Sequence, residues 1–302
     1  MQLDLIAQDF SERAVSPFHE LGAYESLWDE QNASFKSIAA LFSKRVGSIP
    51  SDFVERARAI FYANEVHARL KDAGVTSYGV RVHGAGEYPE RLRVAEYPVE
   101  LLYFQGMWDL VNSLRSVAVV GTRSPSDEGV ARTRKLVKAL VQEDFTVVSG
   151  LATGIDTAAH SAAIEYGGRT IAVLGTPLSK SYPASNAKLQ REIAAHHLLI
   201  SQVPVKRYSN QINPTSNNFF FPERNITMSA LTDATIIVEA GETSGTLVQA
   251  RHALKQDRKV FILENNFRNP ELKWPHIFEE RGAIRVADYD DIRRHLVSVT
   301  TH

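Results

Sequence analysis

Three short loops in this chain are rich in glycine and in hydroxyl or cationic side chains, the residue types that bind phosphate. They cover residues 121–124, 150–156 and 240–246. Glycine lets a ligand approach the backbone, free amides at a helix start donate to anionic oxygens, and an arginine can bind two such oxygens at once. The pattern predicts a site for the phosphate of a nucleotide or a nucleic acid. It requires no catalytic residue, no metal and no cofactor.

Each of these loops follows a short apolar run and precedes a helical stretch, the order expected in a parallel sheet. We expect strands at residues 117–120, 145–149, 170–174, 198–201, 235–239 and 259–263. We expect helices at about residues 126–143, 156–166, 186–196 and 244–256. Strands separated by helices imply right-handed crossovers and a parallel sheet, and because parallel strands end at the same edge, the loops converge on the carboxyl edge of the sheet. The predicted fold class is α/β, with a doubly wound, mostly parallel, Rossmann-like sheet.

The beginning of the chain has a helical pattern and predicts a small N-terminal domain over residues 1–84, followed by the Rossmann-like domain over 85–302. Apolar residues recur there at helical spacing, as at Phe53, Ala57, Ile60, Phe61 and Val66. Residues 85–115 are expected to form a connector packed on the second domain, with a brief strand at 101–104. Residues 204–222 are expected to form a long irregular loop.

The charge balance excludes a protein that binds nucleic acid through its overall charge. Lys and Arg number 34, Asp and Glu number 35, and the formal net charge is −1. Any contact with nucleic acid therefore depends on a local basic patch. The absence of cysteine excludes disulfides and thiolate metal sites. With no long apolar run and no signal peptide, we expect a cytoplasmic protein that does not contact a membrane.

Two features have both a structural and a functional interpretation. Asp156 precedes His160 by one helical turn, so the two could form a catalytic pair. A helix-capping Asp156 and a hydrogen-bonded His160 explain the spacing equally well. The phenylalanines Phe219, Phe220 and Phe221 could stack on bases, but three successive phenylalanines are expected to anchor a core.

Several motifs around these loops resemble the DNA-processing protein A family, also called Smf. The matching stretches are VAVVGTRSPSDEG, VVSGLATGIDTAAHSAAI, RTIAVLGTPLSKSYPASNAKL, LISQVP, FFPERN and ATIIVEAGETSGTLVQARHAL. The match extends from about Val82 to about Leu263. The resemblance implies an extended Rossmann-like domain that binds single-stranded DNA, helps to load a RecA-type recombinase and forms a homodimer.

The resemblance also implies which residues hold the DNA, since the family binds it in a positively charged pocket where the loops meet. On this chain the pocket maps to Gly121, Thr122, Arg123 and Ser124, to Gly150, Leu151 and Gly154, and to Arg224 and Asn225. Ser244, Gly245 and Thr246 come from the third loop, and Lys180 and Lys188 are positional expectations rather than motif matches.

The chain departs from the family pattern at identifiable positions. Ile226 stands where the family commonly has the second Arg of FPxRNR, and Glu264 and Asn265 stand where Pro-Gly often follows a strand. Losing an arginine and gaining an acid weakens DNA binding by about 1–3 kcal/mol per charged contact. The chain ends at His302, and we expect it to lack the winged-helix domain that many members carry.

Two other functions stay open at this point. The wider superfamily includes phosphoribohydrolases marked by PGGxGTxxE, but Gln249 occupies the glutamate position here and a carboxamide cannot act as a general base. Alternatively, the cleft senses a nucleotide-derived signal and regulates a partner protein, for example in defence. The near-neutral charge and the altered basic motif favour this alternative over hydrolysis.

Overall fold

The computed structural model describes residues 14–93, 98–211 and 217–297, which divide into two compact units. Unit 1 contains the described residues up to Trp108, together with Leu174–Ser181 and Leu199–Phe221. Unit 2 contains Asp109–Val173, Tyr182–Leu198 and the described residues from Pro222 onward. The predicted domain division at residue 84 stays a prediction.

The strands of unit 2 form a parallel sheet in the order β5-β4-β3-β7-β8-β9. They are β3 (Ser116–Val120), β4 (Thr146–Ser149), β5 (Thr170–Leu174), β7 (Ala234–Ile237), β8 (Lys259–Leu263) and β9 (Ile284–Val286). The predicted strands of this sheet are confirmed to within two residues. The sequence pattern does not predict β9, because three residues are too few to show a period.

The order of the strands reverses between β3 and β7. The chain proceeds from β3 through β4 to β5 on one side of the sheet, whereas β7, β8 and β9 lie on the other side of β3. In doubly wound folds the ligand crevice opens at the carboxyl ends of the strands where the order reverses. The loops after β3 and β7 therefore lie where a ligand is expected to bind.

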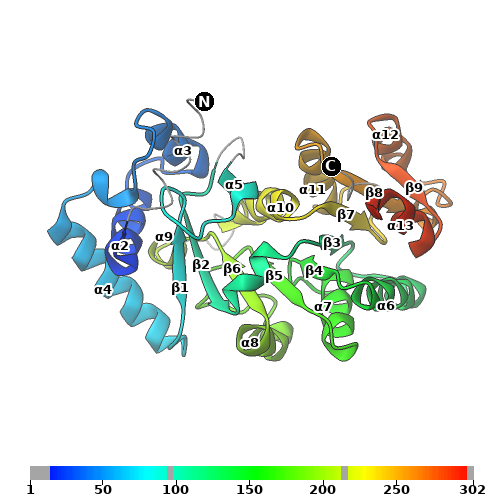
Figure 1. Cartoon of the computed structure of the whole chain (residues 1–302), viewed down its shortest axis with the longest axis horizontal. Helices are drawn as coiled ribbons and strands as arrows, with labels where there is room; N and C mark the ends of the chain where they lie inside the picture. The colour runs from blue at the N-terminus through cyan, green and yellow to red at the C-terminus, as the bar shows by residue number, and fades with distance from the viewer. Residues whose placement is uncertain (1–13, 94–97, 212–216, 298–302) are drawn as a thin grey trace. The chain divides into compact units, whose positions relative to one another are not determined.

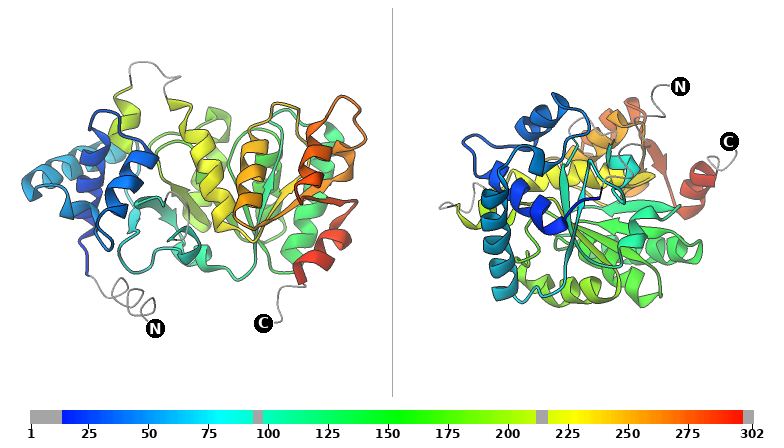
Figure 2. Two further views of the ribbon diagram at one scale, coloured as in Figure 1. Left: turned by 90° about the horizontal axis from the view of Figure 1, so that it is seen from above. Right: turned by 60° about the vertical axis from the view of Figure 1, so that its left-hand side comes forward.

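Helices cover both faces of this sheet. They are α6 (Asp127–Gln142), α7 (Ile155–Glu165), η3 (Ala184–Asn186), α8 (Ala187–His196), α10 (Phe220–Leu231), α11 (Thr246–Lys255), η5 (Glu264–Asn266), α12 (Trp274–Glu280) and α13 (Tyr289–Val297). Figure 1 shows α6 and α7 below the strands and α10 and α11 above them, and Figure 2 shows α10 beside α11. The four predicted helices are confirmed, and the sheet is doubly wound as expected.

The core of unit 2 lies between the sheet and the helices α6 and α7. It contains Val117, Leu140, Val147, Ala159 and Ile236, all at most 5% exposed. Apolar residues on both faces of each strand explain why these strands read as continuous apolar runs rather than as an alternation. The sheet and its flanking helices thus provide a rigid frame for the loops above them.

Unit 1 combines helices with a short sheet in the order β1-β2-β6. Its elements are α2 (Pro17–Trp28), α3 (Phe35–Ser43), η1 (Pro50–Asp52), α4 (Arg56–Asp72), β1 (Gly79–Val82), α5 (Glu90–Arg93), β2 (Leu101–Gly106), β6 (Leu198–Ser201) and α9 (Val205–Ser209), and η2 (Trp108–Asn112) follows β2. Strands β1 and β2 are antiparallel. The predicted strand at 101–104 is confirmed as β2.

Phe220 is an anchor of the core of unit 1. Its ring is fully buried and lies 6.0 Å, centroid to centroid, from both Trp28 and Phe35. Phe219 is 39% exposed, and the ring of Phe221 occupies the space over Gly175, where an added Cβ would lie 2.4 Å from it. The expectation of core anchoring is confirmed for Phe220.

The prediction of an irregular loop over residues 204–222 is wrong for residues 205–209 and 220–222, which are helical. Helix α9 forms at its start, and α10 begins at Phe220, while residues 212–216 lie outside the described residues. The buried carboxylate of Glu25 accepts hydrogen bonds from the Val205 and Lys206 amides at 2.6 and 3.0 Å, and from the Tyr103 hydroxyl at 2.6 Å. A carboxylate at the helix start stabilises α9, and no local pattern predicts this contact across the chain.

The helical pattern of the N-terminal region is confirmed for the described residues from 17 to 72, whereas β1 forms within the region expected to be helical. The buried face of α4 also differs from the predicted one. Ile60 and Phe61 are exposed, at 39% and 56%, whereas Tyr62 and Val66 are buried. Tyr62 combines burial with a hydrogen bond from its hydroxyl to Asp29 at 2.5 Å. None of the helices in the described part of the chain is long and apolar enough to cross a membrane.

Candidate functional site

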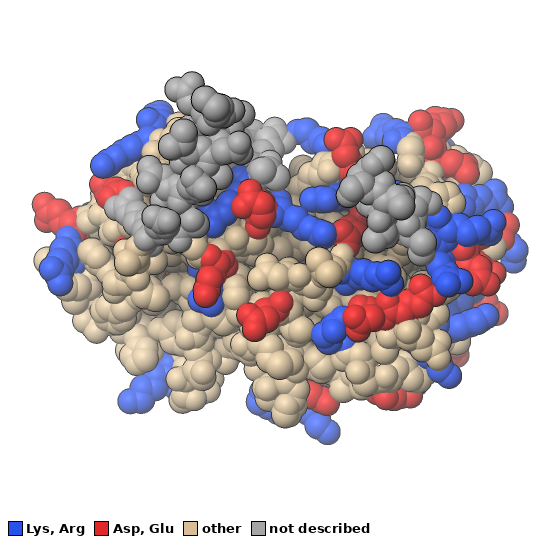
Figure 3. Space-filling model, viewed as in Figure 1, with Lys and Arg blue, Asp and Glu red and all other residues tan. Residues whose placement is uncertain are grey.

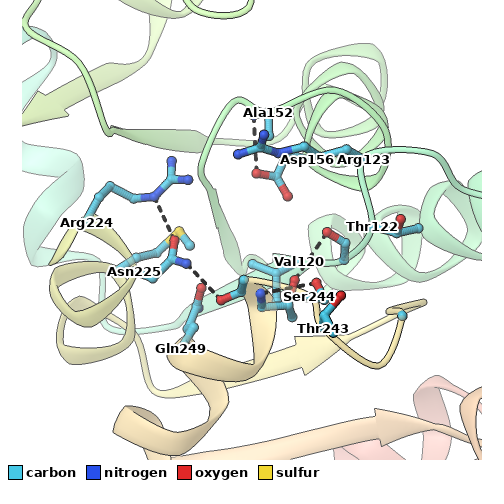
Figure 4. A pocket seen from close by; sticks show the side chains of 15 residues that line it. Val120, Thr122, Arg123, Ala152, Asp156, Arg224, Asn225, Thr243, Ser244 and Gln249 are labelled. Atoms are coloured by element: carbon cyan, nitrogen blue, oxygen red, sulfur yellow. Dashed lines mark hydrogen bonds between the residues drawn. The ribbon is translucent and has the colours of Figure 1, made fainter. Parts of the chain in front are cut away.

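A pocket of about 330 Å³ opens in unit 2 at the carboxyl ends of β3 and β7, and we call it the switch pocket. Figure 4 shows its side chains, with Arg123 and Arg224 reaching it from opposite sides. The predicted site residues that line it are Gly121, Thr122, Arg123, Arg224, Asn225, Ser244, Gly245 and Thr246. The structure therefore brings the first and third loops and the FPERN motif together.

Other predicted site residues are not among those that line this pocket. They are Ser124, Gly150, Leu151, Gly154, Lys180 and Lys188. Lys188 is exposed on α8, and Lys180 belongs to unit 1. Lining residues that the sequence analysis did not assign to the site are Val120, Ala152, Asp156, Met228, Gly241, Thr243 and Gln249. For some of them the sequence did hold a signal: Gly241 and Thr243 follow a predicted strand, and Asp156 lies at a predicted helix start.

The loop after β3 is fixed by backbone contacts on both sides. The Thr122 amide donates to the Glu239 carbonyl at 2.6 Å, and the Ile155 amide donates to the Thr122 carbonyl at 3.2 Å. Gly154 allows this second contact, since its φ is +78° and a Cβ there would lie 2.3 Å from the Thr122 oxygen. Gly154 thus positions the loop that carries Thr122 and Arg123.

The side chain of Glu239 holds the end of the same loop. Its carboxylate accepts from the Ser126 amide at 2.9 Å and from the Ser126 hydroxyl at 2.7 Å. The Ser126 hydroxyl in turn caps α6 by accepting from the Gly129 amide at 3.0 Å. The strand β7 ends two residues before Glu239, so this glutamate lies in the loop rather than in the predicted strand.

Arg224 is a buried cation on α10, with 5% of its surface exposed. Its Nη1 donates to the carbonyl oxygens of Gly150, at 2.5 Å, and Val173, at 2.7 Å, and its Nε donates to Asn225 Oδ1 at 2.8 Å. A Cβ on Gly150 would lie 2.2 Å from Nη1. Gly150 therefore makes room for Arg224, which explains its position outside the pocket lining.

Asp156 is a buried carboxylate in the lining of the switch pocket. It does not cap α7 as expected, because Gly154 occupies the cap position and Asp156 lies in the first turn. Its Oδ2 instead accepts from the Ala152 amide at 3.3 Å. Burial raises the pKa of Asp156, and the positive charge of Arg224 opposes that rise. Burial likewise lowers the pKa of Arg224, and Asp156 opposes that change.

His160 does not form a catalytic pair with Asp156. Its ring is fully buried, and Nδ1 lies 2.7 Å from the Thr170 hydroxyl. Burial lowers the pKa of His160 from its usual 6.5 to about 3, so the ring is neutral. The structural interpretation of the Asp156–His160 spacing is therefore correct for His160.

The start of α11 forms the remaining wall. Ser244 lies one residue before Gly245, which is the N-cap of α11, and its hydroxyl accepts from the Thr246 amide at 3.2 Å. The Thr246 hydroxyl donates to the Gly121 carbonyl at 3.2 Å. Asn225 Nδ2 joins α10 to this wall by donating to the Gly245 carbonyl at 3.1 Å. Buried Gln249 donates to the Thr235 hydroxyl at 3.2 Å.

The charged side chains that line the switch pocket are two guanidinium groups and one carboxylate. Such a set, with hydroxyls and loop amides around it, can bind an anion of one negative charge. No group of three His, Cys, Asp or Glu side chains suited to a metal occurs among the residues for which the structure gives positions. The chemistry that the pocket offers is anion binding.

Comparison with known proteins relates this chain to DNA-processing proteins. The Smf protein of Synechocystis is 41% identical over 203 residues, which are 66% of this chain and 47% of that protein. The DNA processing protein DprA of Bacillus subtilis is 31% identical over 227 residues, which are 75% of this chain and 73% of that protein. The chain thus spans about half the length of the first relative and about three quarters of the second.

Solved structures agree with this relationship. The X-ray structure of DNA processing protein A from Streptococcus pneumoniae matches with a TM-score of 0.65 and 28% identity, over 99% of this chain and 98% of that chain. DNA processing protein A from Helicobacter pylori, solved to study its single-stranded DNA binding mode, matches with a TM-score of 0.63 and 25% identity, over 74% and 96% of the two chains. A family model for DNA recombination-mediator protein A matches residues 79–297, so the chain belongs to that family.

Proposed function

We propose that this chain is a single-stranded DNA-binding protein that holds the DNA backbone in the switch pocket. The observation that carries the proposal is the pairing of Arg123 and Arg224 in one pocket at the point where the strand order reverses. The relative from Helicobacter pylori, studied for its binding of single-stranded DNA, supports the ligand class. Figure 3 shows basic and acidic side chains interspersed on the face it presents. Together with the formal net charge of −1, this favours a local site over a broad basic surface.

The two arginines contribute differently to binding a phosphate. Arg224 is held in place by the Gly150 and Val173 carbonyls, and its Nη2 donates to none of the described residues. Arg123 is exposed in the loop after β3. The carboxylate of Asp156 leaves the lining with one net positive charge, which matches the single charge of an internal phosphodiester. Binding is therefore directed at the backbone, with the phosphate fixed by guanidinium and loop amide groups.

Several further properties are proposed from family membership. They are loading of a RecA-type recombinase, assembly as a homodimer, a role in recombination or transformation, and a cytoplasmic location. We also propose that the chain is not an enzyme. Gln249 supports this, because it occupies the position of the hydrolase glutamate in the pocket and its carboxamide cannot accept a proton from water.

Fluorescence anisotropy of a labelled, unstructured 30-nucleotide strand, measured over a salt series, tests the proposal. We expect affinity to fall steeply with salt, with a slope of about −0.7 per neutralised phosphate. Arg123→Glu should weaken binding by more than about tenfold and reduce the slope. Arg251→Glu, an equal charge change at an exposed site on α11 outside the pocket lining, is the matched control and should bind like the wild type.

Equal affinity of the folded Arg123→Glu variant and the wild type would overturn the assignment of the switch pocket. Absence of binding by the folded wild-type protein at low salt would overturn the proposed function itself. In that case a nucleotide that raises the melting temperature of the wild type, but not of Arg123→Glu, would support the sensing alternative.

A further inference from the structure

A second pocket of about 380 Å³ adjoins the switch pocket in unit 2, and we call it the asparagine pocket. The two pockets share Thr122 and Gly241 in their linings. Asn265, Asn266 and Asn269 line the second pocket, and no aromatic side chain does. A nucleotide whose phosphate occupies the switch pocket would therefore place its neighbouring base against hydrogen-bonding groups rather than stacking surfaces.

Asn265 offers this pocket a hydrogen-bond acceptor. Its Nδ2 donates to the Val238 carbonyl at 3.0 Å, and this contact fixes which end of the amide is oxygen. Its Oδ1 is buried and accepts no hydrogen bond from any residue that the structure describes. A buried acceptor without a partner is unfavourable, so a ligand N–H at this oxygen would be stabilised.

The neighbouring Asn266 has a different role. Its Oδ1 accepts from the Ala240 amide at 3.0 Å, and its Nδ2 donates to the Val238 and Leu263 carbonyls at 3.1 and 3.0 Å. These contacts use the side chain to hold the loops after β7 and β8 together. Asn265, which is half-buried, is therefore the amide whose oxygen retains an acceptor for a ligand.

The described lining of the asparagine pocket has no net positive charge to bind a second phosphate, because Glu239 and Arg132 both belong to it. The carboxylate of Glu239 lines it, and this acid lies 3.7 Å from Arg132, which also pairs with Glu128 at 2.6 Å. An ionised carboxylate is an acceptor only and repels a phosphate, but it accepts well from the exocyclic amino group of a base. Asn265 and Glu239 both supply acceptors to the lining, and the Glu239 oxygens also accept from Ser126. Arg132 is the cation of the lining, and its guanidinium pairs with the carboxylates of Glu128 and Glu239.

The residues that build this pocket include a departure from the family pattern. Glu264 and Asn265 stand where Pro-Gly is common, and the carboxylate of Glu264 is paired with Arg285 at 2.8 Å and Arg268 at 3.0 Å. These arginines lower the pKa of Glu264, so the added acid is compensated locally. The departure therefore adds a hydrogen-bonding amide without leaving an unpaired charge.

We propose that the asparagine pocket binds the base next to the phosphate held in the switch pocket, and that it prefers a base with an exocyclic amino group to thymine. The proposal rests on the proposed function, because it assigns the base subsite of the same DNA. An exocyclic amino group has two N–H donors, which can meet the acceptors of Asn265 and Glu239. The corresponding position of thymine is a carbonyl oxygen, which cannot donate to them.

The test compares labelled oligo-dC, oligo-dT and oligo-dU of equal length at pH 7.5, by anisotropy with the wild-type chain. We expect oligo-dC to bind about three- to tenfold more tightly than oligo-dT. Oligo-dU lacks both the amino group and the thymine methyl, so it should bind like oligo-dT. If oligo-dU binds like oligo-dC, the methyl group rather than the amino group is responsible, and the proposal is overturned.

Variants assign the preference to the pocket. Asn265→Gly, which restores the family residue, should remove the preference for oligo-dC while the affinity for oligo-dT changes by less than about twofold. Asn112→Gly is the matched control, since Asn112 is exposed in unit 2 outside both pockets, and it should keep the preference. Thermal unfolding shows whether each variant is folded. The comparison of oligo-dU with oligo-dC uses the wild type alone, so it tests the proposal even if a variant does not fold.

The outcomes separate this inference from the proposed function. Equal affinity of the wild type for all three strands, with salt-dependent binding, would leave the proposed function intact and overturn the base subsite. Loss of binding to all three strands would overturn both. A preference that persists in folded Asn265→Gly would place the base elsewhere and overturn the assignment to this pocket.

Discussion

The two arginines of the switch pocket have the same predicted role in the sequence but lie in opposite physical settings. Arg224 is buried on α10. Its guanidinium donates to the carbonyl of Gly150, directly after β4, and to the carbonyl of Val173, near the end of β5. Arg123 is exposed in the loop after β3. The comparison shows that Arg224 stabilises the fold and also lines the site, whereas Arg123 lines the site from an exposed loop.

The largest effect on stability is expected for Arg224→Ala. The variant removes a buried cation, leaves the Gly150 and Val173 carbonyls without their donor and leaves Asp156 without its nearby positive charge. Breaking a buried, hydrogen-bonded charge arrangement lowers the free energy of unfolding by about 3–5 kcal/mol. Urea denaturation measures this change, and Arg224→Lys should recover only part of it, because an ammonium cannot reproduce the planar fork.

A loss below about 1 kcal/mol in Arg224→Ala would contradict the distinction between the two arginines. It would mean that the carbonyls and Asp156 find other partners when the guanidinium is removed. Arg224 would then act on the ligand alone, as Arg123 is proposed to do.

The next effect is expected at the glycine that positions the loop of Arg123. Gly154→Ala introduces a Cβ 2.3 Å from the Thr122 oxygen at a φ of +78°. The backbone strain and the close contact together should lower the free energy of unfolding by about 2–4 kcal/mol. Gly241→Ala is the matched control, since nothing lies within 4 Å of its added Cβ. Equal stability of the two variants by urea denaturation would show that the loop adapts to the alanine.

The elements around the pocket could be predicted from the sequence because their signals are local. The apolar runs that form β3, β4 and β7 end at small-residue loops, and helical periods follow each of them. Strand–loop–helix order then implies a parallel sheet with its loops at one edge. The convergence of Gly121, Arg123 and Thr246 on one pocket follows from this order alone.

The roles of individual residues could not be predicted, because they depend on contacts between distant parts of the chain. Gly150 resembles a ligand-binding glycine in the sequence, but it makes room for a side chain 74 residues later. Glu25 stabilises the start of α9 from a helix 180 residues earlier, so a predicted loop is partly helical. Such contacts leave no periodic pattern and no local change of composition in the sequence.

An intermediate effect is expected for the pH dependence of His160→Gln. Burial lowers the pKa of His160 from 6.5 to about 3, so between these values only the unfolded chain binds the proton. The stability that neutral His160 contributes is present above pH 6.5 and is lost as the pH falls below it. Between pH 7 and pH 5 this loss is about 2 kcal/mol in the wild type and should be absent in His160→Gln.

Urea denaturation of both proteins at pH 7 and pH 5 measures the difference. Glu25, Glu100 and Asp156, whose pKa values are raised by burial, change stability in the opposite sense, but they are common to both proteins and cancel in the comparison. His196→Gln, at an exposed position on α8, should keep the wild-type dependence. Identical pH dependence of His160→Gln and wild type would contradict a neutral, buried ring.

The smallest effect on stability is expected for Arg123→Ala, and it completes the comparison with Arg224. An exposed arginine contributes at most about 1 kcal/mol through surface pairing, and most such changes stay within about 0.5 kcal/mol. Removing its charge should nevertheless weaken DNA binding by about five- to thirtyfold, because a charged hydrogen bond to phosphate is lost. Urea denaturation and anisotropy on the same preparation separate the two quantities. If stability and affinity fell together, Arg123 would hold the loop rather than the ligand, and the two arginines would share one architectural role.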